Sequence, residues 1–131
     1  MGMPAAKQGD RVTAIDFHLI QPPGAPPPPP VPVPHPFSGV LLQQLSTNVR
    51  IMGRAAATVG SVAINTPPHI PLGGMFVNPP TNRATIRFGS TSVRINGKAA
   101  ARTGDAAETC ADPMPNPGGR VVAAGTVRIG G

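Results

Sequence analysis

Short stretches in which apolar and polar residues alternate recur along the chain, and each runs directly into a turn signal. In Val93-Arg94-Ile95 two apolar residues flank an arginine, which is typical of a β-strand with one buried face. Asn96-Gly97 follows, and both central residues of a type I′ hairpin turn need the positive φ that these residues tolerate. Residues 49–53 and 127–131 have the same arrangement. The pattern predicts small β-hairpins, because glycine would stop a helix in the alanine triplets within about two turns.

These hairpins belong to an internal repeat with an offset of 44 residues. Residues 46–61 match residues 90–105 at ten of 16 positions, and such self-similarity is the signature of repeated structural units. A third copy is divided between the two ends of the chain. Residues 3–10 carry the Ala-Ala and Gly-Asp pairs of the repeat, and residues 126–131 carry its strand and turn. We therefore expect the last strand to pair with the first and to complete three equivalent units about one axis.

The composition is consistent with one small domain over residues 1–131 that has little core of its own. There are 16 Gly, 19 Pro and four Phe, with no Trp or Tyr, so the large aromatic anchors of a core are scarce. Only 12% of the chain is charged, which argues against a disordered polyelectrolyte. The single cysteine, Cys110, excludes an internal disulfide. A metal ion or a partner subunit is then the expected source of additional stability.

The charge and the N-terminal segment limit the classes of partner. The formal net charge is +6, but the basic residues are scattered and no aromatic residues alternate with them, so we expect no nucleic-acid partner. An acidic protein surface remains open as a partner. The chain has no run of about 18 apolar residues and no signal-peptide core, which predicts synthesis in the cytoplasm without a signal peptide.

A proline-rich stretch covers residues 22–36. It is expected to be a polyproline II segment or an extended loop, because proline fixes φ and lacks an N–H donor. We interpret it as a stiff surface loop. The alternative is a docking segment for a proline-binding module, which would make the protein a proline-rich interaction module.

The three histidines and the cysteine form a candidate metal-binding set. His18 lies eight residues after Asp10, and His69 lies eight residues after Ser61, the equivalent position in its repeat. Cys110 follows the third copy of the repeat, and His35 enters from the proline-rich stretch. Three imidazoles and one thiolate would complete a tetrahedral zinc shell and give one structural ion, although iron remains possible.

Two other interpretations of these residues stay open. His35 and His69 would then be ordinary loop residues and Cys110 a small buried side chain, or three histidines would hold a hydrolytic zinc with an open fourth position. The chain has no phosphate-binding loop, HExxH helix or nucleophile motif, so we expect no enzyme.

Nearly the whole chain resembles the PAAR-repeat proteins, the spike tips of contractile injection machines. The resemblance rests on Pro4-Ala5-Ala6 with Gly9-Asp10, on residues 93–105 with their copy at 46–61, and on Pro34-His35-Pro36. It implies an all-β fold, a small pseudo-threefold cone of short strands and hairpins with zinc near its apex.

The resemblance also implies ligands, partners and a role. It assigns zinc to His18, His35, His69 and Cys110, and it implies a non-enzymatic monomer that caps a trimeric β-helical spike of the valine-glycine-repeat type. A single chain can match a threefold partner only if it is itself pseudo-threefold. The tip would sharpen the spike and contact the target membrane transiently during puncture. Because the chain ends with the strand of the third repeat, we expect a bare tip or an adaptor for effector cargo.

Two features depart from the family pattern. Ser61 stands where the family usually has Asp, which puts one turn contact in doubt. The proline tract before His35 is long, which suggests a variant branch such as the extracellular phage-tail-like particles rather than the type VI secretion system.

Overall fold

The computed structural model describes residues 2–131, which form short strands and no helix. The predicted all-β class is confirmed. In chain order the strands are β1 (Met3–Pro4), β2 (Arg11–Gln21), β3 (Val31–Gln43), β4 (Arg50–Ile51), β5 (Arg54–Ala55), β6 (Val62–Asn65), β7 (Met75–Phe76), β8 (Arg83–Ile86), β9 (Arg94–Ile95), β10 (Lys98–Ala99), β11 (Ala106–Thr109), β12 (Asn116–Val122) and β13 (Arg128–Ile129).

Six strands close into an antiparallel barrel. Their order is β12-β11-β8-β6-β3-β2, and β2 pairs back with β12, so each of the six has a neighbour on both sides. The short strand β7 adds to the outer part of β2. Closure removes the open edges that would otherwise pair with other chains. The barrel core consists mainly of small side chains around Phe37 and Leu41.

Strand β2 alternates between an inner and an outer face. Val12, Asp16 and His18 are buried, whereas Ile15 and Phe17 between them are about half exposed. Successive side chains of a strand point to opposite faces, so this period of two places an acid and a histidine on the inner face of a long hairpin. The sequence pattern of β2 therefore positions the polar groups described below.

The proline-rich loop is shorter than the predicted residues 22–36. Residues 31–36 belong to β3, and only residues 22–30 connect β2 to β3. Successive residues of a strand direct their N–H groups to opposite edges of the strand. Pro32, Pro34 and Pro36 occupy every second position, so the N–H groups that proline lacks would all have pointed to the same edge. This part of β3 pairs only with β2, and its other edge has no strand partner until Gly39. His35 is thus fixed on a strand.

Three two-stranded antiparallel pairs form the other end of the molecule: β4–β5, β9–β10 and β1–β13. We call all three hairpins, although β1 and β13 are not joined by a turn. The third hairpin joins the two ends of the chain, with Met3 opposite Ile129, as the divided repeat predicts. Met52 and Asn96 both adopt positive φ in their turns, which confirms the predicted turn geometry. Ile51, Ile95 and Ile129 are buried to nearly the same degree beneath the three hairpins.

A cyclic set of backbone hydrogen bonds defines the axis of this end. The N–H of Ala6 donates to Ala101, that of Ala101 to Ala57, and that of Ala57 to Ala6, at 2.9–3.1 Å. All three alanines are fully buried. Only a small side chain fits where the three segments that follow β1, β5 and β10 converge. The crowding at the axis therefore explains the alanine residues of the repeat. The expected pseudo-threefold arrangement is present in this ring.

The turn contact at Ser61 is preserved. Ser61 Oγ accepts a hydrogen bond from the N–H of Thr58 at 2.9 Å, as Asp10 and Asp105 do from the residue three positions earlier. Those aspartates also pair with Lys7 and Arg102, whereas the second repeat has the uncharged Thr58. Ser61 therefore stands in place of the aspartate in the one repeat where the residue three positions earlier is uncharged.

Replacing Ser61 by alanine is expected to cost about 1–3 kcal/mol of unfolding free energy. The hydroxyl is fully buried and also donates to the carbonyl of Gln44 at 2.7 Å, so its removal leaves the buried N–H of Thr58 and the carbonyl of Gln44 without this partner. Urea unfolding of Ser61→Ala checks this, with exposed Ser92→Ala as the matched control. Equal stability of the two variants would contradict the assigned role.

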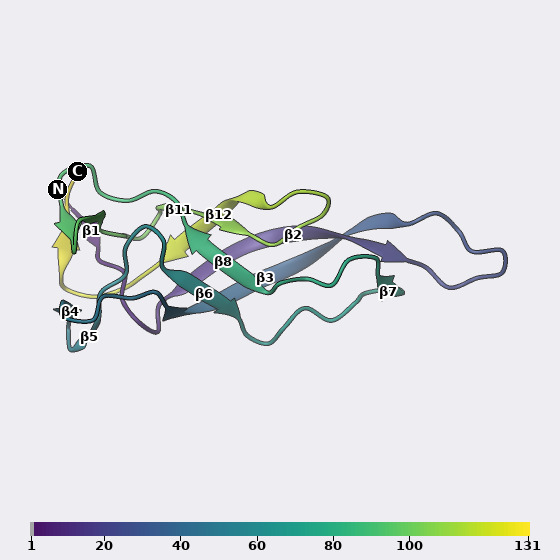
Figure 1. The fold of residues 1–131 in the computed structure, drawn as a ribbon, viewed down its shortest axis with the longest axis horizontal. Coiled ribbons are helices and arrows are strands. Elements are labelled where there is room, and N and C mark those ends of the chain that lie inside the picture. Colours follow the sequence, from purple (N-terminus) through teal and green to yellow (C-terminus); the bar gives the residue numbers. More distant parts are fainter. Residues whose placement is uncertain (1) are drawn as a thin grey trace.

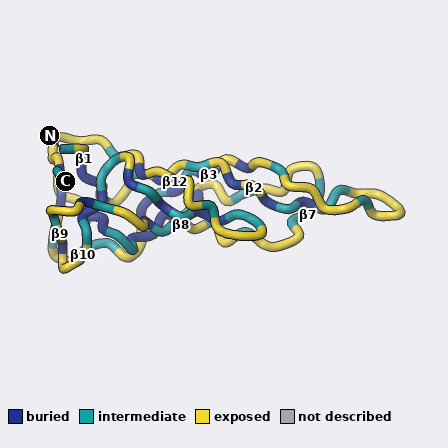
Figure 2. The backbone as a smooth tube through the Cα atoms, turned by 90° about the horizontal axis from the view of Figure 1, so that it is seen from above, coloured by how far each residue is buried: buried dark blue, intermediate teal, exposed yellow. Residues whose placement is uncertain are grey.

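The molecule is long and tapers from one end to the other. Both chain termini lie at the wide end with β1, β4 and β5, and the β2–β3 hairpin extends to the opposite end (Figure 1). The view from above places β9 and β10 at the same wide end (Figure 2). We call the end formed by the three hairpins the base, and the end formed by residues 22–30 the tip. Among residues 2–131, no helix is long and apolar enough to cross a membrane.

Candidate metal centre

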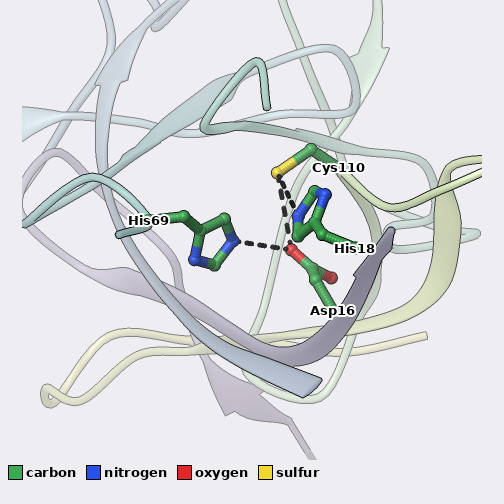
Figure 3. A group of neighbouring side chains, drawn as sticks. All are labelled: Asp16, His18, His69 and Cys110. Atoms are coloured by element: carbon green, nitrogen blue, oxygen red, sulfur yellow. Dashed lines mark hydrogen bonds and ion pairs between the residues drawn. The ribbon is translucent and has the colours of Figure 1, made fainter. Parts of the chain in front are cut away.

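Four metal-binding side chains meet inside the molecule between the barrel and the tip. Asp16 and His18 come from β2, His69 from the connection between β6 and β7, and Cys110 from the residue after β11. Their side chains point toward one another (Figure 3). One potential ligand atom from each lies within 4.8 Å of all the others. Three segments far apart in the sequence thus contribute to one cluster.

The donor atoms are close enough to share one ion. His69 Nε2 lies 3.3 Å from Asp16 Oδ2, and Cys110 Sγ lies 3.5 Å from the same oxygen and 3.7 Å from His18 Nε2. With bond lengths of about 2.0–2.3 Å, two donors of one ion lie about 3–4 Å apart. The cluster therefore has the dimensions of a mononuclear metal site.

His35 borders this cluster from β3. Its ring centroid lies 5.4 Å from that of His18 and 5.5 Å from that of His69. Its Nδ1 lies 2.8 Å from the carbonyl oxygen of Val33, a contact in which only an N–H can take part, so Nε2 carries the free lone pair. That Nε2 is buried and has no hydrogen-bond partner. An orphaned imidazole nitrogen beside three other donors fits a site for a metal ion.

Burial sets the protonation of two of these groups when no ion is bound. It lowers the pKa of His69, with the hydrogen bond to Asp16 as the main opposing influence. The neutral imidazole favoured by burial is the form that ligates metals. Burial also raises the pKa of Cys110 to about 11, so the thiol keeps its proton at neutral pH until a cation displaces it.

A second set of groups holds the ligands in place. Asp112 Oδ2 lies 3.4 Å from His18 Nδ1 and accepts the backbone N–H of Leu19 at 3.1 Å. This contact is within ion-pair distance but makes no hydrogen bond, and His18 Nδ1 is buried without a hydrogen-bond partner. A carboxylate beside the far nitrogen of a ligating histidine helps to orient the ring. Thr109 and Asn116 donate to Asp16 Oδ1, which fixes the carboxylate. The cluster is therefore ordered by its surroundings.

A cavity of about 300 Å³ adjoins one side of the cluster. Its lining includes His18 and Cys110 of the cluster, together with Arg83, Thr85 and Glu108. It is large enough for several water molecules. The cluster therefore has an approach from solvent along this side.

All four residues predicted as ligands from the sequence lie in this region. The structure brings together His18, His69 and Cys110 and places His35 against them. The sequence reasoning missed Asp16. Along β2 the apolar Ile15 and Phe17 alternate with Asp16 and His18, so the sequence pattern alone would place the acid on the outer, polar face. The structure instead buries Asp16 and His18 and leaves Ile15 and Phe17 about half exposed.

A sequence model of the PAAR motif matches residues 32–111, which is more than half of the chain. The matched span includes His35, His69 and Cys110, and both internal copies of the repeat. No curated protein matches the chain. Together with the threefold base, the tapering barrel and the candidate metal site, the match shows that the chain belongs to the PAAR-motif family.

Proposed function

We propose that this protein is a non-enzymatic tip that caps a trimeric β-helical spike through its base and leads with its narrow end. PAAR proteins sit at the tips of contractile injection particles, and membership in the family supports the spike-tip role. The observation that carries the proposal is the threefold base, in which three hairpins surround a cyclic hydrogen-bonded ring. A trimer presents three equal surfaces, and one chain with three similar units can engage all of them.

The narrow end suits penetration of a membrane. Residues 19–38, which include the tip, contain no Asp, Glu, Lys or Arg. Transfer of charged groups into a bilayer is expensive, and a segment without them avoids this cost. Ten of the 15 residues from Pro22 to Pro36 are proline, which keeps the segment stiff. Sharpening of the spike and aid in puncture follow from this shape, and effector cargo could travel on the same tip.

A structural zinc ion would stabilise the narrow half. We infer that His18, His35, His69 and Cys110 are its ligands, since one thiolate and three imidazoles match the preferences of zinc. When bound, the ion would crosslink two strands and two connections between the barrel and the tip. Metal-binding free energy then becomes folding free energy in a region where large apolar side chains such as Ile15, Phe17 and Met75 are exposed.

The charge of the base predicts how it binds its partner. Arg50, Arg94 and Arg128 are exposed at equivalent positions of the three hairpins, and each donates to a nearby glycine carbonyl. Three positive charges around one axis complement a spike end with acidic groups. Reversing all three to Glu is expected to weaken binding to a purified trimeric spike by about 10- to 100-fold, and wild-type binding should weaken with salt.

Biolayer interferometry at several salt concentrations measures this effect. The matched control reverses Arg11, Arg83 and Arg120, which are exposed on barrel strands and give the same change in net charge. If both triple variants bind alike, the base is not the docking surface. If the wild-type protein binds no trimeric spike from the same injection particle, the proposed function is wrong.

A further inference from the structure

We propose that Asp16 binds the metal ion directly through Oδ2, as a fifth donor beside the three histidines and the cysteine. This inference rests on the metal centre of the proposed function and specifies its chemistry. It predicts a site with one carboxylate oxygen, in addition to the nitrogen and sulfur donors.

The first step concerns charge. Asp16 is fully buried, and among residues 2–131 no lysine or arginine lies within ion-pair distance of it. Its one contact of this kind is with His69, at 3.3 Å. A buried carboxylate without a cation is strongly disfavoured. A divalent ion supplies the missing charge, because Zn²⁺ with one thiolate leaves a single positive charge that Asp16 neutralises.

The second step concerns position. Asp16 Oδ2 lies 3.3 Å from His69 Nε2 and 3.5 Å from Cys110 Sγ, and the 3.7 Å separation of Cys110 Sγ and His18 Nε2 is of the same size. Asp16 Oδ2 is therefore at least as close to His69 Nε2 and Cys110 Sγ as Cys110 Sγ is to His18 Nε2. A group that only supported the ligands from outside would lie on their far side, as Asp112 does at His18 Nδ1.

The third step concerns the two oxygens of the carboxylate. Oδ1 is occupied by Thr109 and Asn116, which both donate to it. Among residues 2–131, Oδ2 contacts only His69 Nε2 and Cys110 Sγ. One oxygen is thus anchored and the other remains available to the ion. The unpartnered, buried Nε2 of His35 indicates independently that a ligand belongs in this space.

Cobalt substitution tests the proposal, because Co²⁺ reports its coordination number through the intensity of its visible bands. We expect cobalt-loaded wild-type protein to show the weak bands of a five-coordinate ion, with a thiolate charge-transfer band in the near ultraviolet. Asp16→Asn should produce the stronger bands of a four-coordinate ion. It should also weaken zinc binding, measured by competition with a chromophoric chelator, by more than about 100-fold, beyond the usual effect of an outer-shell partner.

Asp112→Asn is the matched control. It removes another carboxylate next to the site, and we expect it to leave the cobalt bands unchanged and to weaken zinc binding by at most about 100-fold. Cobalt bands in Asp16→Asn that match those of the wild type would overturn the proposal. X-ray absorption of the zinc-loaded wild type serves if Asp16→Asn fails to fold: five donors including one sulfur support the proposal, and four overturn it. Wild-type protein that binds no metal would instead refute the metal centre as a whole.

Discussion

Removing the metal ion is expected to lower the melting temperature of the protein by about 20 °C or more. Structural zinc contributes about 10–16 kcal/mol in small zinc-dependent domains, and a loss of even about 5 kcal/mol shifts the melting temperature of a domain of this size by about 20 °C. The barrel core cannot compensate, because apart from Phe37, Leu41 and Ile86 it consists mostly of alanine and valine. Plasma mass spectrometry with thermal unfolding before and after chelation measures both quantities.

The variants Cys110→Ala and His69→Ala extend this test. Each removes one donor from the cluster, and we expect each to lose the ion and most of its stability. The internal control is the response to chelator, which should lower the melting temperature of the wild type and leave that of Cys110→Ala unchanged. Purified wild-type protein that contains no metal and melts at the same temperature after chelation would contradict a structural ion.

The base was the part of the fold most accessible to sequence reasoning. A repeat with ten of 16 identical positions fixes three similar units, and the turn residues at Met52-Gly53 and Asn96-Gly97 identify their hairpins. The pairing of the first and last strands follows from the division of the third copy between the chain ends. Local patterns and symmetry were sufficient here because two of the units are built from residues that are close in the sequence, and the third repeats their pattern.

The barrel and the tip were less accessible for a physical reason. The long β2–β3 hairpin runs into the proline-rich stretch, and composition alone favours a loop there. Proline is compatible with β3 only because this part of the strand has a free edge, which is a property of the tertiary structure. The four candidate ligands could be selected because histidine and cysteine are rare in this chain. Asp16 could not, since its role depends on the buried face of β2.

Enlarging a side chain of the alanine ring is expected to cost about 3 kcal/mol or more and to lower the melting temperature by about 10–15 °C. Ala101 is fully buried and exchanges backbone hydrogen bonds with Ala6 and Ala57 around the axis. Leucine at this position must displace at least one of the three strands, because a packed interior has no room for the added carbons. The damage reaches all three hairpins, since each alanine of the ring is bonded to the other two repeats.

Thermal unfolding of Ala101→Leu, with Ala124→Leu as its control, measures this effect. Ala124 is exposed near the base, so the same substitution there should change the unfolding free energy by no more than about 0.5 kcal/mol. Zinc content per folded chain should be equal in both variants, because neither substitution removes one of the candidate ligands. If Ala101→Leu and Ala124→Leu have the same melting temperature, the three segments that carry the alanine ring do not converge as the structure places them. A loss of stability confined to Ala101→Leu would instead show that the base depends on close packing at this ring. The ring lies on the axis that the base would share with a trimeric spike.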